Sequence, residues 1–290
     1  MLKKRLTACI VLKNNFVVQS INFNRYLPVG SLPVTVEFLN NWGIDEIVIL
    51  DIDAAKYNRK PNFDLIKKAA ERCRVPLAIG GGITSVEDIK KLMHCGADKV
   101  VINAAALARP DFITEAANVF GNQCIVVSMD VSGDNKKNYF VYSHISNKSL
   151  GINPVEWAKQ VESLGAGELF VTSVNRDGSK SGYDIELINI IARSVNIPVI
   201  ASGGAGKPED VLDLFKKTNA SAASVGNYFH FFEHSVNITK AILSKNSENV
   251  RIDDPANYLE SQFIDNCRLA KKSDEFLENL LYKKIIKETI

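Results

Sequence analysis

The stretch VPLAIGGG (residues 75–82) recurs 122 positions further along the chain as IPVIASGG (residues 197–204). In both copies a short apolar run, typical of a buried parallel strand, ends in glycines and is followed by a helix-favouring segment. The same register relates Gly43 and Glu46 to Gly165 and Glu168, Asp51 to Ser173 and, at an offset of 119, Val11 to Asp130. Repetition at such a long period indicates that the chain consists of two similar halves.

Short apolar, β-favouring runs alternate with amphipathic segments along most of the chain, which is the pattern of successive strand–helix units. We expect eight strands, at residues 6–12, 47–52, 76–79, 99–103, 124–129, 169–173, 198–201 and 222–225. We expect helices at residues 34–42, 63–73, 86–94, 110–120, 154–164, 185–194 and 209–217. Eight alternating units in two similar halves predict an α/β fold, a closed (β/α)₈ TIM barrel with a two-fold half-barrel repeat.

The sequence pattern changes near the end of the chain. We expect residues 1–244 to form the barrel and residues 245–290 to form a C-terminal helical extension, because residues 257–290 are charged, favour helix and carry spaced apolar side chains. Such helices either pack on the side of the barrel or form an element that docks a partner. A length of 290 residues is compatible with one barrel and such a tail.

The composition is that of a globular protein with a large core, since 46% of the residues are hydrophobic and 23% are charged. Lys and Arg number 35 against 33 Asp and Glu, and this balance gives no case for a nucleic-acid partner. No stretch approaches the roughly 18 apolar residues of a membrane span, so no membrane association is expected. The five cysteines are odd in number and widely spaced, which favours a reduced, cytoplasmic location.

Neither a metal nor a cofactor is predicted. The sequence has no Cys-x-x-Cys pair and no motif for a redox cofactor. Its histidines, which lack the spacing of metal ligands and are interpreted as structural or solvated, are His94, His144, His230 and His234.

Glycine-rich turns follow two of the predicted strands. Glycine lets backbone amides approach an anion closely, and a helix that begins just beyond the turn adds the positive end of its dipole. Residues 80–82 (GGG) and 203–206 (GGAG) therefore predict two cradles for a phosphorylated small molecule. The predicted phosphate-binding residues, which include residues at the ends of strands four, six and eight, are Gly81, Gly82, Asn103, Gly178, Gly203, Gly204, Gly226 and Asn227.

Polar side chains at the carboxyl ends of the strands are candidates for chemistry, because the active sites of (β/α)₈ barrels lie at that face. Asp51 ends the second predicted strand, Asp130 follows the apolar run of the fifth, and Asp177 follows the sixth. Asp130 is expected at the barrel mouth with little solvent around it, where a carboxylate can act as a general acid or base. We predict these three carboxylates as catalytic.

From residue 2 to about residue 231 the sequence resembles the cyclase subunit of imidazole glycerol phosphate synthase. The most specific segments are LDI (50–52), GGGI (80–83), GADKV (96–100), GNQCIVV (121–127), GAGE (165–168), RDGSKSGYD (176–184) and IASGGAG (200–206). The resemblance implies a (β/α)₈ barrel that binds a substrate with a phosphate at each end. Two glycine-rich cradles suit such a substrate.

The resemblance also implies a partner. In the family a glutaminase docked at the amino-terminal face supplies ammonia, which passes through the barrel and closes an imidazole ring while a carboxamide ribonucleotide is released. The resemblance places Asp98 at the partner interface. The residues that match the family's four-residue ammonia gate are Arg5, Glu46, Lys99 and Glu168. Two acids and two bases at the strand starts would also neutralise one another inside the barrel.

The sequence departs from the family at the chemistry face. The family has catalytic carboxylates at the ends of strands one and five; Asp130 matches the second, but strand one carries Val11, which cannot transfer a proton. A loop lysine that closes over the substrate in the family is replaced by Gln19. Loss of one member of an acid–base pair costs about 10² to 10⁴ in rate. The gate residues, in contrast, are all present.

These departures lead to a hypothesis about function. A divergent branch of the family is associated with amidation of sugars in bacterial surface polysaccharides such as lipopolysaccharide. It resembles this chain in departing from the family at the chemistry face while keeping the gate residues. We therefore expect a cyclase-like subunit that accepts ammonia from a glutaminase and delivers it to a separate sugar amidotransferase. One alternative is a histidine-pathway cyclase that converts the phosphoribulosyl-formimino-carboxamide ribonucleotide and ammonia to imidazole glycerol phosphate and aminoimidazole carboxamide ribonucleotide. Another is a non-catalytic docking scaffold.

Overall fold

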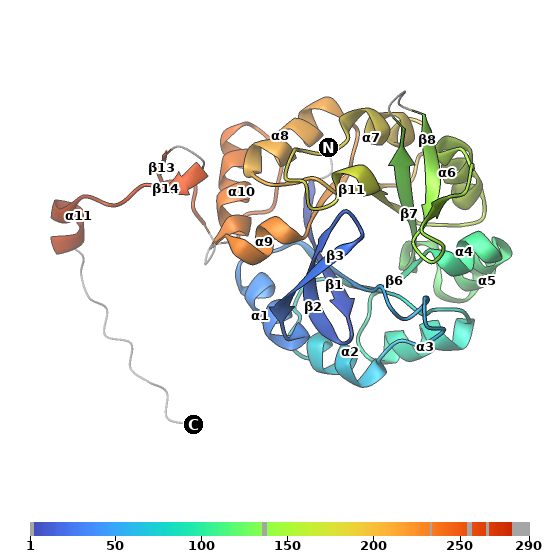
Figure 1. Ribbon diagram of the computed structural model, residues 1–290. Coiled ribbons are helices and arrows are strands. Elements are labelled where there is room, and N and C mark those ends of the chain that lie inside the picture. Colours follow the sequence, from blue (N-terminus) through green and yellow to red (C-terminus); the bar gives the residue numbers. More distant parts are fainter. Residues whose placement is uncertain (1–2, 135–137, 233, 254–256, 265–266, 280–290) are drawn as a thin grey trace.

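The computed structural model describes residues 3–134, 138–232, 234–253, 257–264 and 267–279. Eight parallel strands form a closed barrel surrounded by helices (Figure 1). The barrel strands are β1 (Arg5–Lys13), β4 (Glu46–Asp51), β5 (Leu77–Gly80), β6 (Lys99–Ile102), β7 (Ile125–Gly133), β10 (Glu168–Ser173), β11 (Val199–Ser202) and β12 (Ala222–Val225). The ring closes because β1 pairs with β12 and β10 pairs with β7. The predicted (β/α)₈ barrel is confirmed.

Half of the helices that follow the barrel strands, α2, α3, α6 and α7, begin at a residue whose side chain caps the helix. In α3 the Ser85 hydroxyl accepts a hydrogen bond from the Asp88 amide (3.2 Å), and the Asp88 carboxylate accepts one from the Ser85 amide (3.1 Å). The helices that follow the barrel strands are α1 (Leu32–Asn41), α2 (Phe63–Ala70), α3 (Val86–His94), α5 (Asp111–Phe120), α6 (Pro154–Ser163), α7 (Ile185–Ala192), α8 (Pro208–Lys217) and α10 (Ser235–Lys245). The seven predicted helices agree with these bounds to within three residues, and α10 was not predicted.

Two antiparallel additions extend the sheet at the carboxyl end of the barrel. Strands β2 (Phe16–Ile21) and β3 (Arg25–Gly30) continue from β1, and β8 (Tyr139–Ser143) and β9 (Lys148–Ser149) continue from β7. The turn between β1 and β2 is Asn14–Asn15, both at positive φ, as a tight hairpin requires. The short helices α4 (Ala104–Ala108) and α9 (Asn227–Phe231) begin directly after β6 and β12.

The inside of the barrel is layered along its axis. Alternate residues of each strand point inward, so β1 contributes Arg5, Cys9 and Val11 to successive layers. The middle layer is apolar and consists of Cys9, Val48, Ala78, Val101, Val126, Phe170, Ile200 and Ala222. A larger apolar shell lies between the strands and the helices. Charged residues therefore occupy only the two ends of the interior.

The chain leaves α10 along the amino end of the barrel. The Lys4 amide donates to the Asn249 carbonyl (2.8 Å), and the Arg251 guanidinium donates to the Ile44 carbonyl (2.8 Å). Beyond this the described residues form a small hairpin, β13 (Phe263–Ile264) and β14 (Arg268–Leu269), and one short helix, α11 (Asp274–Glu278). Figure 1 shows these elements away from the barrel wall. Residues 254–256, 265–266 and 280–290 of the predicted extension lie outside the described residues.

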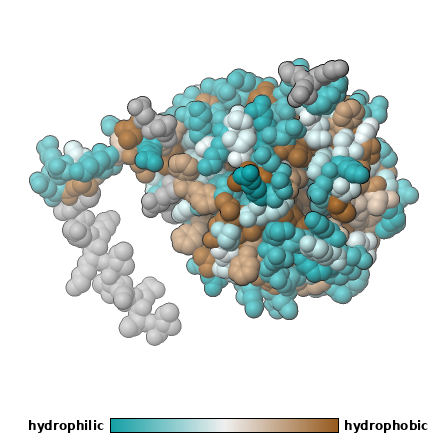
Figure 2. Space-filling model, in the orientation of Figure 1, coloured by the Kyte–Doolittle hydropathy of each residue, from teal (hydrophilic) through white to brown (hydrophobic). Residues whose placement is uncertain are grey.

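Polar side chains cover most of the outer helices in the view of Figure 2, and hydrophobic ones gather around the centre of this face. Within the described ranges, no helix combines the length and apolar composition that crossing a bilayer requires. The five cysteines are all free.

Candidate active site

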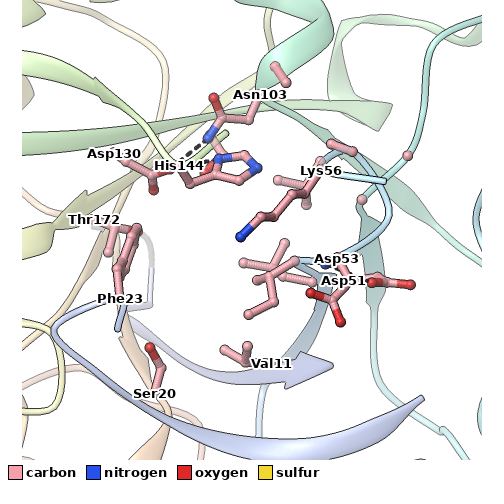
Figure 3. A pocket seen from close by; sticks show the side chains of 18 of the residues that line it. Val11, Ser20, Phe23, Asp51, Asp53, Lys56, Asn103, Asp130, His144 and Thr172 are labelled. Carbon is pink, nitrogen blue, oxygen red and sulfur yellow. Dashed lines mark hydrogen bonds and ion pairs between the residues drawn. The ribbon is translucent and has the colours of Figure 1, made fainter. Parts of the chain in front are cut away.

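A cavity of about 410 Å³ opens at the carboxyl ends of the barrel strands (Figure 3). Its walls come from β1, β4, β6, β7 and β10 and from the loops that follow them. The predicted catalytic and phosphate-binding residues that line it are Asp51, Asp130, Asp177, Gly81, Gly82 and Asn103. The fold thus brings together residues from both halves of the chain.

Asp130 lies on β7 near the mouth, and its side chain is 9% exposed. One of its carboxylate oxygens accepts a hydrogen bond from the Asn103 amide (2.9 Å). The same oxygen is 3.6 Å from Nδ1 of His144, on the loop that follows β8. A buried carboxylate with an amide donor and an imidazole beside it can exchange protons with a ligand in the cavity.

Asp177 follows the single 3-10 turn after β10 and is tied to β2 and to the β2–β3 loop. Its carboxylate accepts hydrogen bonds from the Ser20 hydroxyl (2.6 Å) and the Phe23 amide (3.1 Å). Burial raises the pKa of Asp177; the two hydrogen bonds offset part of this rise, and the charge of Asp130 adds to it. Asp177 therefore holds the loop over the cavity as well as facing it.

Asp51 is engaged by its own loop. Its carboxylate accepts hydrogen bonds from the amides of Asp53 and Ala54 (both 3.1 Å) and pairs with the Arg59 guanidinium (3.2 Å). The neighbouring Asp53 pairs with Lys13 (3.0 Å). These contacts brace the rim of the cavity, so a carboxylate that was predicted as catalytic also has a clear role in loop structure.

The first glycine cradle opens onto the cavity. Gly81 and Gly82 have φ values of +107° and +71°, a region that favours glycine. A Cβ atom at Gly82 would lie 2.3 Å from the Arg59 carbonyl oxygen, so only glycine fits this turn. Thr84 and the first residues of α4, Ala104 and Ala105, line the same side of the cavity. Backbone amides in such a turn suit an anionic group.

The second cradle is placed differently. Its predicted residues, which do not line the cavity, are Gly178, Gly203, Gly204, Gly226 and Asn227. The Asn227 side chain donates to the Ser20 carbonyl (2.6 Å) and accepts from the Ser20 amide (3.3 Å). A Cβ atom at Gly178 would lie 2.5 Å from the same carbonyl oxygen. The end of β2 thus lies against this cradle.

Two cavity residues escaped the sequence prediction. His144 was interpreted as structural or solvated, yet it lines the cavity beside Asp130, and Lys56 points its amine into the same space (Figure 3). Neither belongs to a recognisable motif. The only available signal is position, since each follows a strand that ends at the mouth. Val11 lies on the β1 side of the cavity, away from Asp130, as the sequence alignment of the halves predicts.

The other end of the barrel carries the four predicted gate residues, and they form one closed ring. Arg5 pairs with Glu46 (2.8 Å) and with Glu168, while Lys99 pairs with Glu46 (2.7 Å) and Glu168 (2.8 Å). Burial acts to lower the pKa of Lys99 and of Arg5, but the two glutamates outweigh it and raise both above their usual values. The ring is therefore stabilised in its fully charged form.

Asp98, the predicted interface residue, is exposed at the amino end of β6, next to Lys99. Its carboxylate accepts a hydrogen bond from the Leu77 amide (2.9 Å). Within the part of the chain that the structure describes, no group of three or more His, Cys, Asp or Glu side chains is placed to hold a metal ion.

The arrangement defines a class of protein. Barrel enzymes of the (β/α)₈ type place their chemistry at the carboxyl ends of the strands, where glycine-rich loops bind phosphorylated ligands. Here that face holds a cavity with carboxylates from both halves and one open glycine cradle. The fold is that of this class, and the cavity lies at the face where such enzymes place their chemistry.

Known proteins narrow the class to a family. Residues 5–235 match the model of the family described as "Histidine biosynthesis protein", and the chain belongs to this family. The imidazole glycerol phosphate synthase subunit HisF of Hydrogenobaculum sp. (strain Y04AAS1) is 46% identical over 252 residues, 87% of this chain and all of the relative. The subunit HisF of Lactococcus lactis subsp. cremoris (strain MG1363) is 43% identical over 253 residues, 87% of this chain and 98% of the relative.

A protein of Vibrio vulnificus (strain YJ016), provisionally named imidazole glycerol phosphate synthase subunit hisF2, is 45% identical over 258 residues, 89% of this chain and 94% of the relative. The predicted resemblance to the cyclase subunit of this synthase is thereby confirmed at the level of the family. The branch associated with sugar amidation stays a prediction.

Proposed function

We propose that this chain is the ammonia-accepting barrel subunit of a glutamine amidotransferase of the imidazole glycerol phosphate synthase type. The observation that carries the proposal is that one barrel has two different ends. A closed ring of four charges lies at the amino end, and an acidic cavity walled by glycines lies at the carboxyl end. An apolar layer separates them. Neutral ammonia can be accommodated by such a layer, whereas an ammonium ion would be strongly disfavoured.

In this proposal a glutaminase docks at the amino end, where Asp98 is exposed, and releases ammonia at the ring. The relatives' names support a multi-subunit enzyme, since each is called a subunit. The five free cysteines support a cytoplasmic location. We retain residues 1–244 as the barrel and residues 245–290 as an extension; exposed Phe276 and Leu277 support a docking role for the latter.

Ring closure is the first candidate for the fate of the ammonia, and the relatives' names favour it. The cavity would hold the phosphoribulosyl-formimino-carboxamide ribonucleotide, with one phosphate on the Gly81–Gly82 cradle. Asp130 would take protons from the incoming nitrogen, and Asp177, with its raised pKa, would be available as a proton donor. The products would be imidazole glycerol phosphate and aminoimidazole carboxamide ribonucleotide.

Delivery of ammonia to a separate sugar amidotransferase is the second candidate, and Val11 favours it. A valine at the cavity wall of β1 cannot donate a proton, although the ring at the other end of the same strand is complete. A chain of this kind would keep the ammonia path and lose efficient ring closure. Amidation of surface-polysaccharide sugars is the process that we assign to this candidate.

Turnover of the ribonucleotide separates the two candidates. The purified chain is given the ribonucleotide and an ammonium salt, beside Val11→Asp and its matched control Val11→Asn. Ring closure predicts turnover of at least about 1 per second in the wild-type chain. Delivery predicts almost no turnover in the wild-type chain. It predicts turnover about 10²-fold higher in Val11→Asp and no such gain in Val11→Asn. Rescue of a histidine auxotroph that lacks its cyclase gives an independent answer, because growth requires ring closure. Absence of turnover in all three proteins, together with failure to bind a glutaminase, would refute the proposed function.

A further inference from the structure

His144 is the only histidine among the described residues that lines the cavity, and its place follows from the β7–β8 hairpin. Asp130 lies on β7, and Val131 pairs with Val141 across the hairpin. The chain that leaves β8 therefore returns toward Asp130, and His144 follows β8 directly. The hairpin thus brings a base and a carboxylate to one wall of the cavity.

The imidazole is oriented by its neighbours. Nδ1 faces the Asp130 carboxylate at 3.6 Å, and the other ring nitrogen points toward the side of the cavity that Lys56 reaches (Figure 3). Tyr142, on the same hairpin, packs edge-to-face on Phe23 of the β2–β3 loop, with ring centroids 6.3 Å apart. The side chain of His144 is 24% exposed, so it is sheltered without being sealed from ligand.

Ring closure with ammonia requires an acid and a base together. New carbon–nitrogen bonds form at the ketone and formimine carbons, a carbon–oxygen bond breaks to release water, and a carbon–nitrogen bond breaks to release the carboxamide ribonucleotide. The protons that the departing oxygen and amine take up equal those that the incoming nitrogen and a ring carbon lose. One carboxylate cannot donate and accept at the same moment. Two groups take up protons as they depart, so a donor is needed beside Asp177, and Val11 supplies none.

We propose that His144 is a catalytic acid of this cavity, with Asp130 as its paired base, and that it supplies the proton that β1 lacks. This inference rests on the ring-closing form of the proposed function. In each cycle the far ring nitrogen of His144 gives a proton to the departing group, and Asp130 takes one from the incoming nitrogen. Water then removes the proton from the Asp130 carboxyl and returns one to the far ring nitrogen, while Nδ1 keeps its own proton. The pair therefore ends each cycle in its starting state.

Electrostatics supports this assignment. An anion at 3.6 Å favours a proton on Nδ1, which leaves the far nitrogen, on the cavity side, as the one that exchanges protons with a ligand. The other titratable side chains that line this cavity are Cys9, Lys13, Tyr26, Asp51, Asp53, Lys56 and Asp177.

The test combines kinetics with a spectroscopic signature. In the full chain, His144→Gln keeps a hydrogen-bonding side chain but cannot ionise, and His94→Gln changes an exposed histidine of α3 in the same way. We expect His144→Gln to lower kcat with ribonucleotide and ammonium salt by about 10² to 10³-fold, to leave KM within about twofold, and to remove one limb of the pH profile of kcat. Val11→Asp/His144→Gln should recover most of the loss, because an acid returns to β1.

The second measurement does not depend on turnover. Imidazole ¹⁵N shifts of His144 at pH 7 should report a proton on Nδ1 in the wild-type chain and a shift toward the other nitrogen in Asp130→Leu or Asp130→Asn. Unchanged ¹⁵N shifts, or a His144→Gln kcat within twofold of wild type, would overturn the inference. If the Asp130 variants change the ¹⁵N shifts but the wild-type chain turns over no ribonucleotide, ring closure is removed from the proposed function and the catalytic assignment is overturned. The contact between Asp130 and His144 would still stand.

Discussion

The two ends of the barrel use opposite means to hold charge. At the amino end two glutamates and two cations neutralise one another through four side-chain contacts, and none of the four is left without a partner. At the carboxyl end carboxylates, glycine amides, the Lys56 cation and the His144 imidazole surround a cavity. The charged side chains at the amino end are thus all paired with one another and close the barrel. Those at the carboxyl end line a cavity and remain available to a ligand.

The largest expected effect comes from breaking the paired end. Glu46→Ala should lower the free energy of unfolding by about 3 kcal/mol, because it leaves the half-buried Arg5 and Lys99 with a single counter-charge. Urea unfolding measures this loss. The matched control is Glu37→Ala, which breaks the exposed pair with Arg72 and should cost less than about 1 kcal/mol. Equal losses in the two variants would mean that burial of the ring contributes nothing.

The next effect comes from a half-buried histidine on the short helix that follows β12. Burial lowers the pKa of His230, on α9, from 6.5 to about 4. Below pH 6.5 the unfolded chain therefore binds a proton at this histidine, whereas the folded chain binds it only below about pH 4. Stability is complete above pH 6.5 and falls by about 3 kcal/mol as the pH drops through this window.

His230→Gln should flatten this part of the stability curve, measured by urea unfolding at pH 7, 5.5 and 4.5. His94→Gln, at an exposed site, should keep the wild-type slope. A His230→Gln curve parallel to wild type would show that other groups cause the acid loss.

The third effect concerns the glycine turn at Gly82, which forms part of the cavity wall at the carboxyl end of the barrel. Gly82→Ala should cost roughly 2–3 kcal/mol, because it adds backbone strain at φ +71° and a contact of 2.3 Å with the Arg59 carbonyl. Gly151→Ala has a similar φ of +69° but no atom within 4 Å, and should cost about 1 kcal/mol. The difference between their thermal or urea midpoints isolates the close approach. Identical midpoints would argue that the loop relaxes freely.

The smallest effect concerns the loop over the mouth. Ser20→Ala removes the hydroxyl that donates to Asp177 and should cost roughly 1–2 kcal/mol, since the buried carboxylate keeps only one donor. Faster proteolytic cleavage between β2 and β3 should accompany it. Ser179→Ala removes an exposed hydroxyl and serves as the control. Cleavage rates that do not differ would show that Asp177 does not hold the loop.

Much of the barrel was predictable because the repeat and the alternation of strands and helices can be recognised in short segments of the sequence. Each of the eight strands appears within two residues of its predicted start, apart from the longer β7, which runs on to Gly133. The hairpins were not predicted. Polar and aromatic residues such as those of β8 do not show the apolar run of a buried strand, although Asn14–Asn15 was a usable signal for the first turn.

The candidate site was predictable where chemistry coincides with a strand end. Asp130, Asp177 and Gly82 line the cavity for that reason. His144 was not predictable, because its place depends on the return of a hairpin rather than on spacing along one strand. The second cradle differs for a similar reason: contact of Ser20 with Asn227 joins residues 207 positions apart. Long-range packing of loops leaves no local pattern.

The four-residue ring also bears on how the two halves recognise each other. Three of its members, Arg5, Glu46 and Lys99, come from the first half, and only Glu168 comes from the second. A barrel assembled from two first halves would enclose four cations against two anions, and one from two second halves would enclose two anions alone. Only the mixed assembly is electrically neutral. If the chain were cut between Phe120 and Ile125 and the fragments produced separately, this imbalance would select heterodimers over homodimers.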